Sequence, residues 1–330
     1  MKSIMYVLIA AACIVCGCQP TQQQTPAAAM TVPVKPVDLQ PLKGQAYALI
    51  KTGISDNNAY IRHHAIEIAA LTSQKELIGD IIQKLNDPSV AVRFVAAAAI
   101  GDMRCPTCGD HLKKALADPD QNVQIAGAYA LIKTGDASHY PKIREAALSP
   151  DGTVRANAIL LMGKLGNKDD LPLIYQASRD NDAPDKVRLQ AVDSIARLKD
   201  VRIYKDKLWP LLISKYADDR VMGIRGMGAL GTKEAREAIQ TMLKDDIAEV
   251  RLCAADELGK LGDSSGLENL VKYFQTNPDL NQATVATGTA VMAIGNTKAN
   301  NLTGYLAKSL NSESPYLRLA AAQSILLMTK

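Results

Sequence analysis

The feature that most constrains this fold is an internal repeat, in which one short motif returns every 31 to 34 residues. The motif aligns on a position that follows a bend and stands near the start of an apolar segment. Its nine occurrences are Arg62, Arg93, Gln124, Arg155, Arg188, Arg220, Arg251, Thr284 and Arg318. A period of this length, kept nine times, predicts a single repeat array rather than separate domains.

Residues at fixed distances from this position indicate where the helices begin and end. An aspartate stands six residues earlier in five repeats, at Asp56, Asp87, Asp118, Asp182 and Asp245. A glycine stands eleven residues later in five repeats, at Gly135, Gly166, Gly231, Gly262 and Gly295. Aspartate favours the start of a helix and glycine its end, so each unit is predicted to be two helices joined by a bend.

The composition agrees with an array of helices. Alanine and leucine carry most of the apolar content and only 4% of the residues are aromatic, which favours helices over strands. One helix pair cannot bury its own apolar face, whereas stacked pairs can. We therefore predict an all-α, right-handed α-solenoid of about nine two-helix repeats over residues 42–330.

The motif D-P-x-x-x-V-R-x-x-A-x-x-A-L-G resembles the HEAT repeat, in particular the short bacterial type also found in phycobilisome-lyase-like proteins. The resemblance is best over residues 86–102, 149–167 and 245–263. On a helical wheel the arginine lies on the packed side. The resemblance implies that it pairs with the aspartate of the preceding bend, often across repeats; a ligand-binding arginine column is the alternative. The predicted structural ladder is Arg62, Arg93, Arg155, Arg188, Arg220, Arg251 and Arg318.

The opposite side of the second helices is predicted to line the concave surface, where solenoids usually bind partners. Nine residues after the motif position, four of the five central repeats carry a basic residue. We expect a mildly basic groove for a protein or peptide partner, with an ordinary solvated helix face as the alternative. The candidate groove residues are Tyr129, Lys133, Asn157, Leu160, Lys164, Gln190, Asp193, Arg197, Arg225, Asp256 and Lys260.

The N-terminus has the pattern of a secretory signal, with Lys2, an apolar stretch over residues 4–15 and then small residues. Its end, Val-Cys-Gly-Cys, resembles a bacterial lipobox, which implies a lipid on Cys18; an ordinary cleaved signal is the alternative. Residues 1–17 are thus a predicted signal peptide. Residues 18–41, rich in Gln, Pro, Ala and Thr, are a predicted disordered tether. The implied location is the bacterial cell envelope, and Gln19 favours the outer membrane.

Residues that could carry chemistry are few. We find no nucleophile elbow, Walker loop or dinucleotide-binding motif, and we expect no catalytic site, cofactor or metal. A local disulfide between Cys105 and Cys108 is favoured in an oxidising compartment. A redox pair, or zinc held with His111, are the alternatives. The net charge of +4 does not call for a nucleic acid partner.

We therefore expect a lipid-anchored scaffold that binds a protein or peptide. The resemblance to phycobilisome-lyase-like proteins leaves open an enzyme acting on a tetrapyrrole, and a purely structural envelope component is a further alternative.

The chain stops inside its last predicted helix, where Ile325, Leu326 and Met328 form an apolar end. Solenoid ends normally need a polar cap. Self-association through this last repeat is therefore another expectation.

Overall fold

The computed structural model describes residues 34–278, 280 and 284–330, and every regular element there is helical. Nine helix pairs follow one another, as the repeat predicts. The first helices of the pairs are α1 (Lys43–Ile54), α3 (Ile78–Gln83), α5 (Gly109–Leu116), α7 (Tyr140–Ala146), α9 (Leu171–Arg179), α11 (Trp209–Leu212), α13 (Lys233–Thr241), α15 (Leu267–Thr276) and α17 (Thr303–Leu310). The second helices are α2 (Ala59–Leu71), α4 (Val90–Asp102), α6 (Gln121–Thr134), α8 (Gly152–Leu165), α10 (Asp185–Arg197), α12 (Ala217–Leu230), α14 (Ala248–Lys260), α16 (Val285–Thr297) and α18 (Pro315–Met328).

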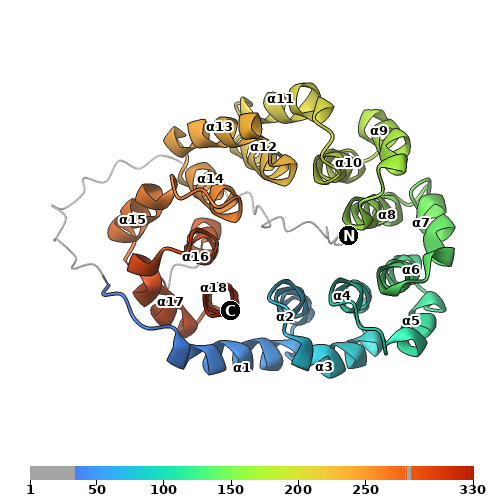
Figure 1. Ribbon diagram of the computed structural model, residues 1–330, viewed down its shortest axis with the longest axis horizontal. Helices are drawn as coiled ribbons and strands as arrows, with labels where there is room; N and C mark the ends of the chain where they lie inside the picture. The colour runs from blue at the N-terminus through green and yellow to red at the C-terminus, as the bar shows by residue number, and fades with distance from the viewer. Residues whose placement is uncertain (1–33, 279, 281–283) are drawn as a thin grey trace, which may run out of the picture.

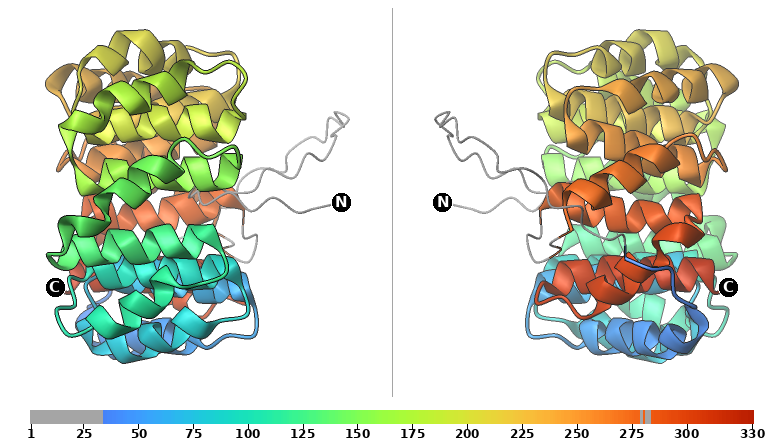
Figure 2. Two further views of the ribbon diagram at one scale, coloured as in Figure 1. Left: turned by 90° about the vertical axis from the view of Figure 1, so that its right-hand side faces the viewer. Right: turned by 90° about the vertical axis from the view of Figure 1, so that its left-hand side faces the viewer.

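The pairs form the predicted solenoid, and its two ends meet so that it closes into a ring (Figure 1). The first helices make the outer layer and the second helices the inner layer. Seen from the side, the helices of both layers run from one rim of the ring to the other (Figure 2). The ring closes because α1 and α2 pack against α18. What the sequence predicts as a concave groove is therefore the inner wall of a ring.

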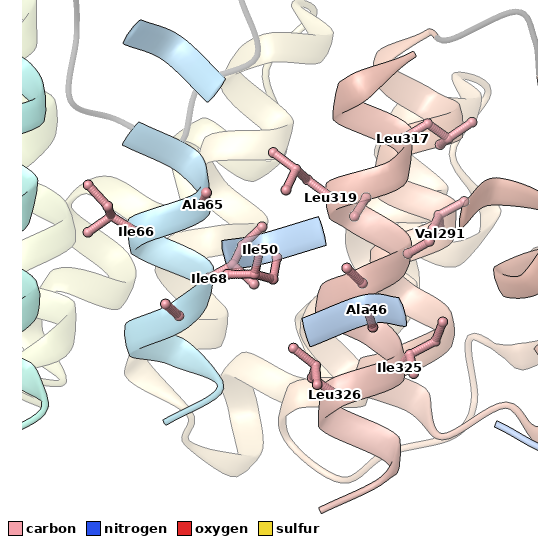
Figure 3. Close-up of a cluster of buried hydrophobic side chains, with 14 of the residues drawn as sticks. Ala46, Ile50, Ala65, Ile66, Ile68, Val291, Leu317, Leu319, Ile325 and Leu326 are labelled. Atoms are coloured by element: carbon pink, nitrogen blue, oxygen red, sulfur yellow. The ribbon is translucent and has the colours of Figure 1, made fainter. Parts of the chain in front are cut away.

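An apolar core holds the two ends of the chain together (Figure 3). Ile50 of α1 and Ile325 of α18 are fully buried in it, and Leu326 is 1% exposed. The ammonium of Lys43 adds a hydrogen bond of 2.8 Å to the carbonyl oxygen of Thr329. Ile325 and Leu326 are thus covered by α1 of the same chain. They do not form an exposed apolar end, and self-association itself stays a prediction.

Residues 34–41, predicted as the end of the tether, are instead packed against the last repeat. The backbone N–H of Val37 donates to the hydroxyl of Thr303 at 2.9 Å, and Leu39 is buried. Gly304 permits this approach, because a side chain there would overlap the carbonyl oxygen of Lys35. Val34 and Leu39 pack against the apolar core that joins the first and last helix pairs, whereas the other side chains of this segment are exposed. The predicted signal peptide, Cys18 and the rest of the tether lie outside the described residues.

Glycines end four of the inner helices as predicted. Gly135, Gly166, Gly231 and Gly262 all have a positive φ, the left-handed conformation that favours glycine at a helix C-terminus. Gly295 was wrongly assigned this role. It lies inside α16, where a side chain would meet the backbone of Ser324.

The eighth repeat is also shifted relative to the sequence alignment. Thr284 is the N-cap of α16, and its hydroxyl accepts a hydrogen bond of 3.1 Å from the N–H of Thr287. The fourth residue of α16, where other inner helices carry the arginine, is Gly288. The connection after α15 is longer than in other repeats, which moves the helix start along the sequence.

No helix among the described residues is both long and apolar enough to span a membrane.

Candidate partner-binding site on the inner wall

Seven of the inner helices carry an arginine in their first turn, and its guanidinium bonds to one or both of two successive bends. In six repeats it donates to a backbone carbonyl of the bend before its own helix. In four repeats it donates to a carboxylate 25 residues later. Arg93, for example, donates to the carbonyl of Asp87 at 2.9 Å and to the carboxylate of Asp118 at 2.8 Å. The four inter-repeat pairs are Arg62–Asp87, Arg93–Asp118, Arg155–Asp180 and Arg220–Asp245.

This geometry corrects the predicted pairing. The carboxylate comes from the bend of the following repeat, whereas the preceding bend supplies only carbonyl oxygens. In the fifth repeat the carboxylate belongs to Asp180 rather than to the predicted Asp182, because that bend is longer. Asp56 belongs to the first bend, and its carboxylate accepts from the N–H of Asn58.

The remaining members of the predicted ladder contact carbonyls only, apart from one pair within a helix. Arg251 donates to the carbonyl of Asp245 at 2.6 Å, and Arg318 to that of Ser312 at 2.7 Å. Arg188 donates to the carbonyl of Ala183 and pairs with Asp185 of its own helix. The positions 25 residues after Arg188 and Arg251 are isoleucine and threonine, so no carboxylate is present there.

A pocket of about 370 Å³ opens at the C-terminal ends of the inner helices from α4 to α12. Four of the predicted groove residues line it: Tyr129, Lys133, Lys164 and Arg197. The two lysines and the arginine come from three consecutive inner helices, α6, α8 and α10, at the same position in each repeat. The other lining residues are Asp102, Gly163, Lys199 and Ala229.

The pocket carries more positive than negative charge. Lys164 pairs with Asp102 at 2.6 Å, and the hydroxyl of Tyr129 donates to the same carboxylate. Burial raises the pKa of Tyr129, and the charge of Asp102 raises it further, so this hydroxyl stays protonated. Arg197 pairs with Asp193 at 2.6 Å. Within the described part of the chain, Lys133 forms no ion pair.

Lys199 completes the basic wall, and the sequence did not predict it. Its backbone has a φ of 61° just after α10, which turns the side chain toward the end of α12. There its ammonium donates to the carbonyl of Leu230 at 3.2 Å. Asp102 was also missed as a site residue, although it occupies the same repeat position as Lys133 and Lys164.

Comparison with known proteins identifies the repeat. The sequence matches the family of HEAT repeats over residues 48–131, 109–196 and 205–288, which together make up more than half of the chain. The chain belongs to the HEAT-repeat family. No curated protein matches this HEAT-repeat chain.

Solved structures also resemble this HEAT-repeat protein. The complex of CpcE and CpcF of phycocyanin lyase from Nostoc sp. PCC7120 is 18% identical with a TM-score of 0.44. That match covers 78% of this chain and 99% of the other. Human deoxyhypusine hydroxylase in complex with glycerol is 18% identical with a TM-score of 0.38, covering 78% of this chain and 97% of the other.

The other predicted groove residues of the HEAT ring do not form one open surface. Asn157 and Gln190 are 6% and 3% exposed. The amide of Asn157 donates to Asn122 of the neighbouring inner helix, and that of Gln190 donates to Asp193 and Ser194 of its own helix. Leu160 is half-buried. The wheel predicted all three to face the concave surface, but packing between neighbouring inner helices covers Asn157 and Gln190.

At the far end of the predicted groove, the basic residue Lys260 is paired with carboxylates of its own helix. Lys260 pairs with both Asp256 and Glu257 at 2.8 Å. Asn296 donates to Asp256 at 2.7 Å. Burial alone would lower the pKa of Lys260, but these two carboxylates raise it. Arg225 lies half-buried in the same stretch of wall. Among the predicted groove residues, the excess positive charge thus lies mainly in the pocket between α4 and α12.

The cysteines of the described residues do not line this pocket. A disulfide joins Cys105 to Cys108 in the turn between α4 and α5. Cys253 is buried in α14, and burial raises the pKa of its thiol to about 12. His111 is exposed on α5. Among residues 34–278, 280 and 284–330, no cluster of histidine, cysteine and carboxylate side chains is arranged to hold a metal ion.

Proposed function

We propose that this HEAT ring is a non-enzymatic scaffold of the bacterial envelope, and that its basic pocket binds an acidic segment of a protein partner. HEAT solenoids typically bind proteins, which supports the general role. The observation that carries the specific proposal is the convergence of Lys133, Lys164 and Arg197 on one pocket of the inner wall. Cations gathered in a recess attract carboxylates more strongly than scattered surface cations do.

The closed ring restricts what can bind there. A partner cannot lie along an open groove, so it must present a short segment or a chain end at the rim where the inner helices finish. Lys133 is available for such a carboxylate, whereas Lys164 would have to share its contact with Asp102. The hydroxyl of Tyr129 keeps Asp102 oriented toward Lys164. An extended acidic segment fits these restrictions best.

Charge reversal in the pocket tests this proposal. The variant carrying Lys133→Glu and Lys164→Glu is compared with one carrying Lys113→Glu and Lys233→Glu, an equal change at exposed outer-layer positions. Crosslinking in cells followed by mass spectrometry should recover an envelope protein with the native chain and the control. The pocket variant should lose that protein while staying folded by circular dichroism, with a lower melting temperature because Lys164→Glu breaks the pair with Asp102. Unchanged partners in the pocket variant would contradict the proposal, and absorbance from a bound pigment would favour a lyase-like enzyme instead.

We further propose that a lipid on Cys18 anchors the ring in the envelope, with the outer membrane favoured by Gln19. The support is the sequence pattern of residues 1–18 alone. In fractionated cells the native chain should sediment with membranes and gain the mass of acyl chains. Cys18→Ala should lose that mass and appear in the soluble fraction. An acylated protein is not expected from the variant, and its detection would refute the assignment of Cys18.

A further inference from the structure

The turn between α4 and α5 is closed by a disulfide where other turns of the ring use a hydrogen bond. In four turns that follow an inner helix, a side chain accepts a hydrogen bond from the backbone N–H two residues later. These side chains belong to Asp136, Asn167, Asp200 and Asp263. Cys105 occupies the equivalent position, and its sulfur accepts hydrogen bonds only weakly. The disulfide to Cys108 therefore takes the place of the missing cap.

The disulfide also helps to hold a backbone conformation that is unfavourable for an arginine. Arg104 ends α4 with a φ of 51°, in the left-handed region that costs free energy for a residue with a Cβ atom. The equivalent residue is glycine in four other repeats, at Gly135, Gly166, Gly231 and Gly262. The chain is fixed by α4 before Arg104 and by the disulfide after it. Breaking the disulfide removes one of these two constraints, so that Arg104 can return to a more favourable conformation.

Asp102 connects this turn to the basic pocket. It is the last residue of α4, and its carboxylate pairs with Lys164 at 2.6 Å and accepts from the hydroxyl of Tyr129. The side chains of Lys164 and Asp102 are 30% and 29% exposed, so a carboxylate of a partner can compete for the same ammonium. Arg104 is exposed and is not among the residues that line the pocket. Loosening the turn would therefore take a negative charge away from the pocket lining.

The two sulfur atoms differ in how easily a reductant can reach them. Cys108 is 1% exposed, whereas Cys105 is partly exposed and the two residues between them are exposed. A thiolate of an incoming dithiol thus attacks Sγ of Cys105, the S–S bond breaks, and Cys108 leaves as a thiolate. Cys108 is the N-cap of α5, where free backbone N–H groups favour a negative charge.

The second thiol of the reductant completes the reaction. It displaces Cys105 from the mixed disulfide and forms the disulfide of the reductant. Two electrons pass to the protein, and the two cysteine thiolates take up two protons. A protein with a pair of neighbouring thiols is the class of reductant that this exchange requires.

We propose that the Cys105–Cys108 disulfide is a redox switch of the basic pocket. Reduction by a protein dithiol releases the end of α4, withdraws Asp102 from Lys164 and strengthens the binding of an acidic segment. The gain in affinity should be about two- to fivefold, the range of one partly exposed ion pair. This inference rests on the proposed function, because it names what regulates the same pocket.

Hydrogen exchange tests the release of the turn without any ligand. The full chain is used with Cys13→Ser, Cys16→Ser and Cys18→Ser, so that the disulfide is the pair that responds to dithiothreitol. Dithiothreitol should speed amide exchange by about tenfold at the last turn of α4 and the first turn of α5, and leave α8 and α10 unchanged. Equal exchange with and without dithiothreitol would show a purely structural disulfide and overturn the proposal.

Binding of an octaglutamate peptide tests the effect on the pocket. The same chain should bind it about two- to fivefold more tightly in dithiothreitol. Cys105→Ser with Cys108→Ser should show this tighter binding without dithiothreitol. Asp102→Asn should bind tightly in both redox states, because the competing carboxylate is already absent.

The Asp102→Asn variant also shows which idea fails. If dithiothreitol strengthens its binding as much as that of the native residue, the effect does not pass through Asp102 and the switch is refuted. A peptide that binds neither redox state contradicts the proposed function of the pocket. The exchange measurement then still decides whether reduction releases the end of α4.

Discussion

At the residue scale, an arginine in the first turn of seven inner helices ties neighbouring segments of the chain together. In six repeats it donates to a carbonyl of the bend before its helix, and in four it neutralises a carboxylate of the next repeat. Such a side chain therefore fastens neighbouring repeats as well as its own bend. Gln124, which replaces the arginine in the third repeat, shows which contact remains without the positive charge. Its amide still donates to the carbonyl of Asp118 at 2.7 Å, but the cross-repeat ion pair is absent at this repeat.

Arg93→Ala should lower the free energy of unfolding by about 2–3 kcal/mol. The side chains of Arg93 and Asp118 are only 13% and 9% exposed, so the substitution leaves a largely buried carboxylate without its partner. Arg188→Ala is the matched control, since Arg188 bonds to carbonyls and to an exposed aspartate of its own helix. Urea unfolding followed by circular dichroism measures both. Equal losses in the two variants would show that the inter-repeat pair contributes nothing.

The contact between His63 and Glu67 on α2 should make stability depend on pH. The carboxylate of Glu67 lies 3.4 Å from His63 and 3.1 Å from His64. Burial acts to raise the pKa of Glu67, but hydrogen bonds from both histidines outweigh it and lower this pKa to about 2. Burial acts to lower the pKa of His63, but Glu67 outweighs it and raises this pKa.

The stabilisation should be greatest between the ordinary pKa values of the two groups, about 4.5 for Glu67 and about 6.5 for His63. It is lost as the pH rises through the raised pKa of His63, and also as the pH falls from about 4.5 toward 2. Glu67→Gln should therefore lower the melting temperature more near pH 5.5 than near pH 8.5. Identical differences at the two pH values would contradict this assignment.

At the element scale, glycines set how closely neighbouring inner helices approach. A Cβ atom added to Gly101 would lie 2.7 Å from Cα of Ala130 on the next inner helix and 3.1 Å from the ring of Tyr129. Gly163, Gly259 and Gly295 meet their neighbours in the same way. The close approach at Gly101 also helps to place Tyr129 at the edge of the basic pocket.

Gly101→Ala should cost about 1–3 kcal/mol of stability, because the backbone of the next helix must move away. Gly288→Ala is the matched control, since nothing lies within 4 Å of the added methyl group and the site is inside α16. That variant should gain about 0.5–1 kcal/mol from higher helix propensity. Thermal unfolding measured by calorimetry compares the two. A stable Gly101→Ala protein would mean that the inner helices can separate freely.

At the scale of the whole molecule, closure of the ring joins residues nearly 300 positions apart. The hydrogen bond from Lys43 to Thr329 and the shared core of α1 and α18 belong to this seam. The arginine ladder does not cross it, because Arg318 bonds to carbonyls of its own bend. Tyr60 and Tyr316 meet there instead, with ring centroids 5.0 Å apart. The seam therefore depends mainly on apolar and aromatic packing.

Ile50→Ala should loosen the ring at this seam. The side chain is fully buried, and its truncation should cost about 2–5 kcal/mol. Amide hydrogen exchange should speed up in α1, α2 and α18 and change little in α8 and α10. Ile159→Ala, an equally buried site in α8, should give the opposite pattern. Faster exchange spread evenly through both variants would indicate that the ring opens as a unit rather than at the seam.

The sequence alone determined the two-helix repeat, the arginine at the start of most inner helices and the glycines at four of their ends. These features depend on helical periodicity and capping, which act over a few residues. Of the candidate site, it located Tyr129, Lys133, Lys164 and Arg197, because they recur at fixed positions within the repeat. It did not predict that Asn157 and Gln190 would be buried, or that the eighth repeat begins its inner helix at Val285.

Only the tertiary structure decided that the array closes, that the ladder runs forward to the next bend and that Lys199 joins the pocket. Closure is the sum of small rotations from one repeat to the next, and none of these is encoded in a single motif. Whether the first helix meets the last therefore depends on every intervening contact. That meeting turned a concave groove into the wall of a ring and covered the apolar C-terminal end.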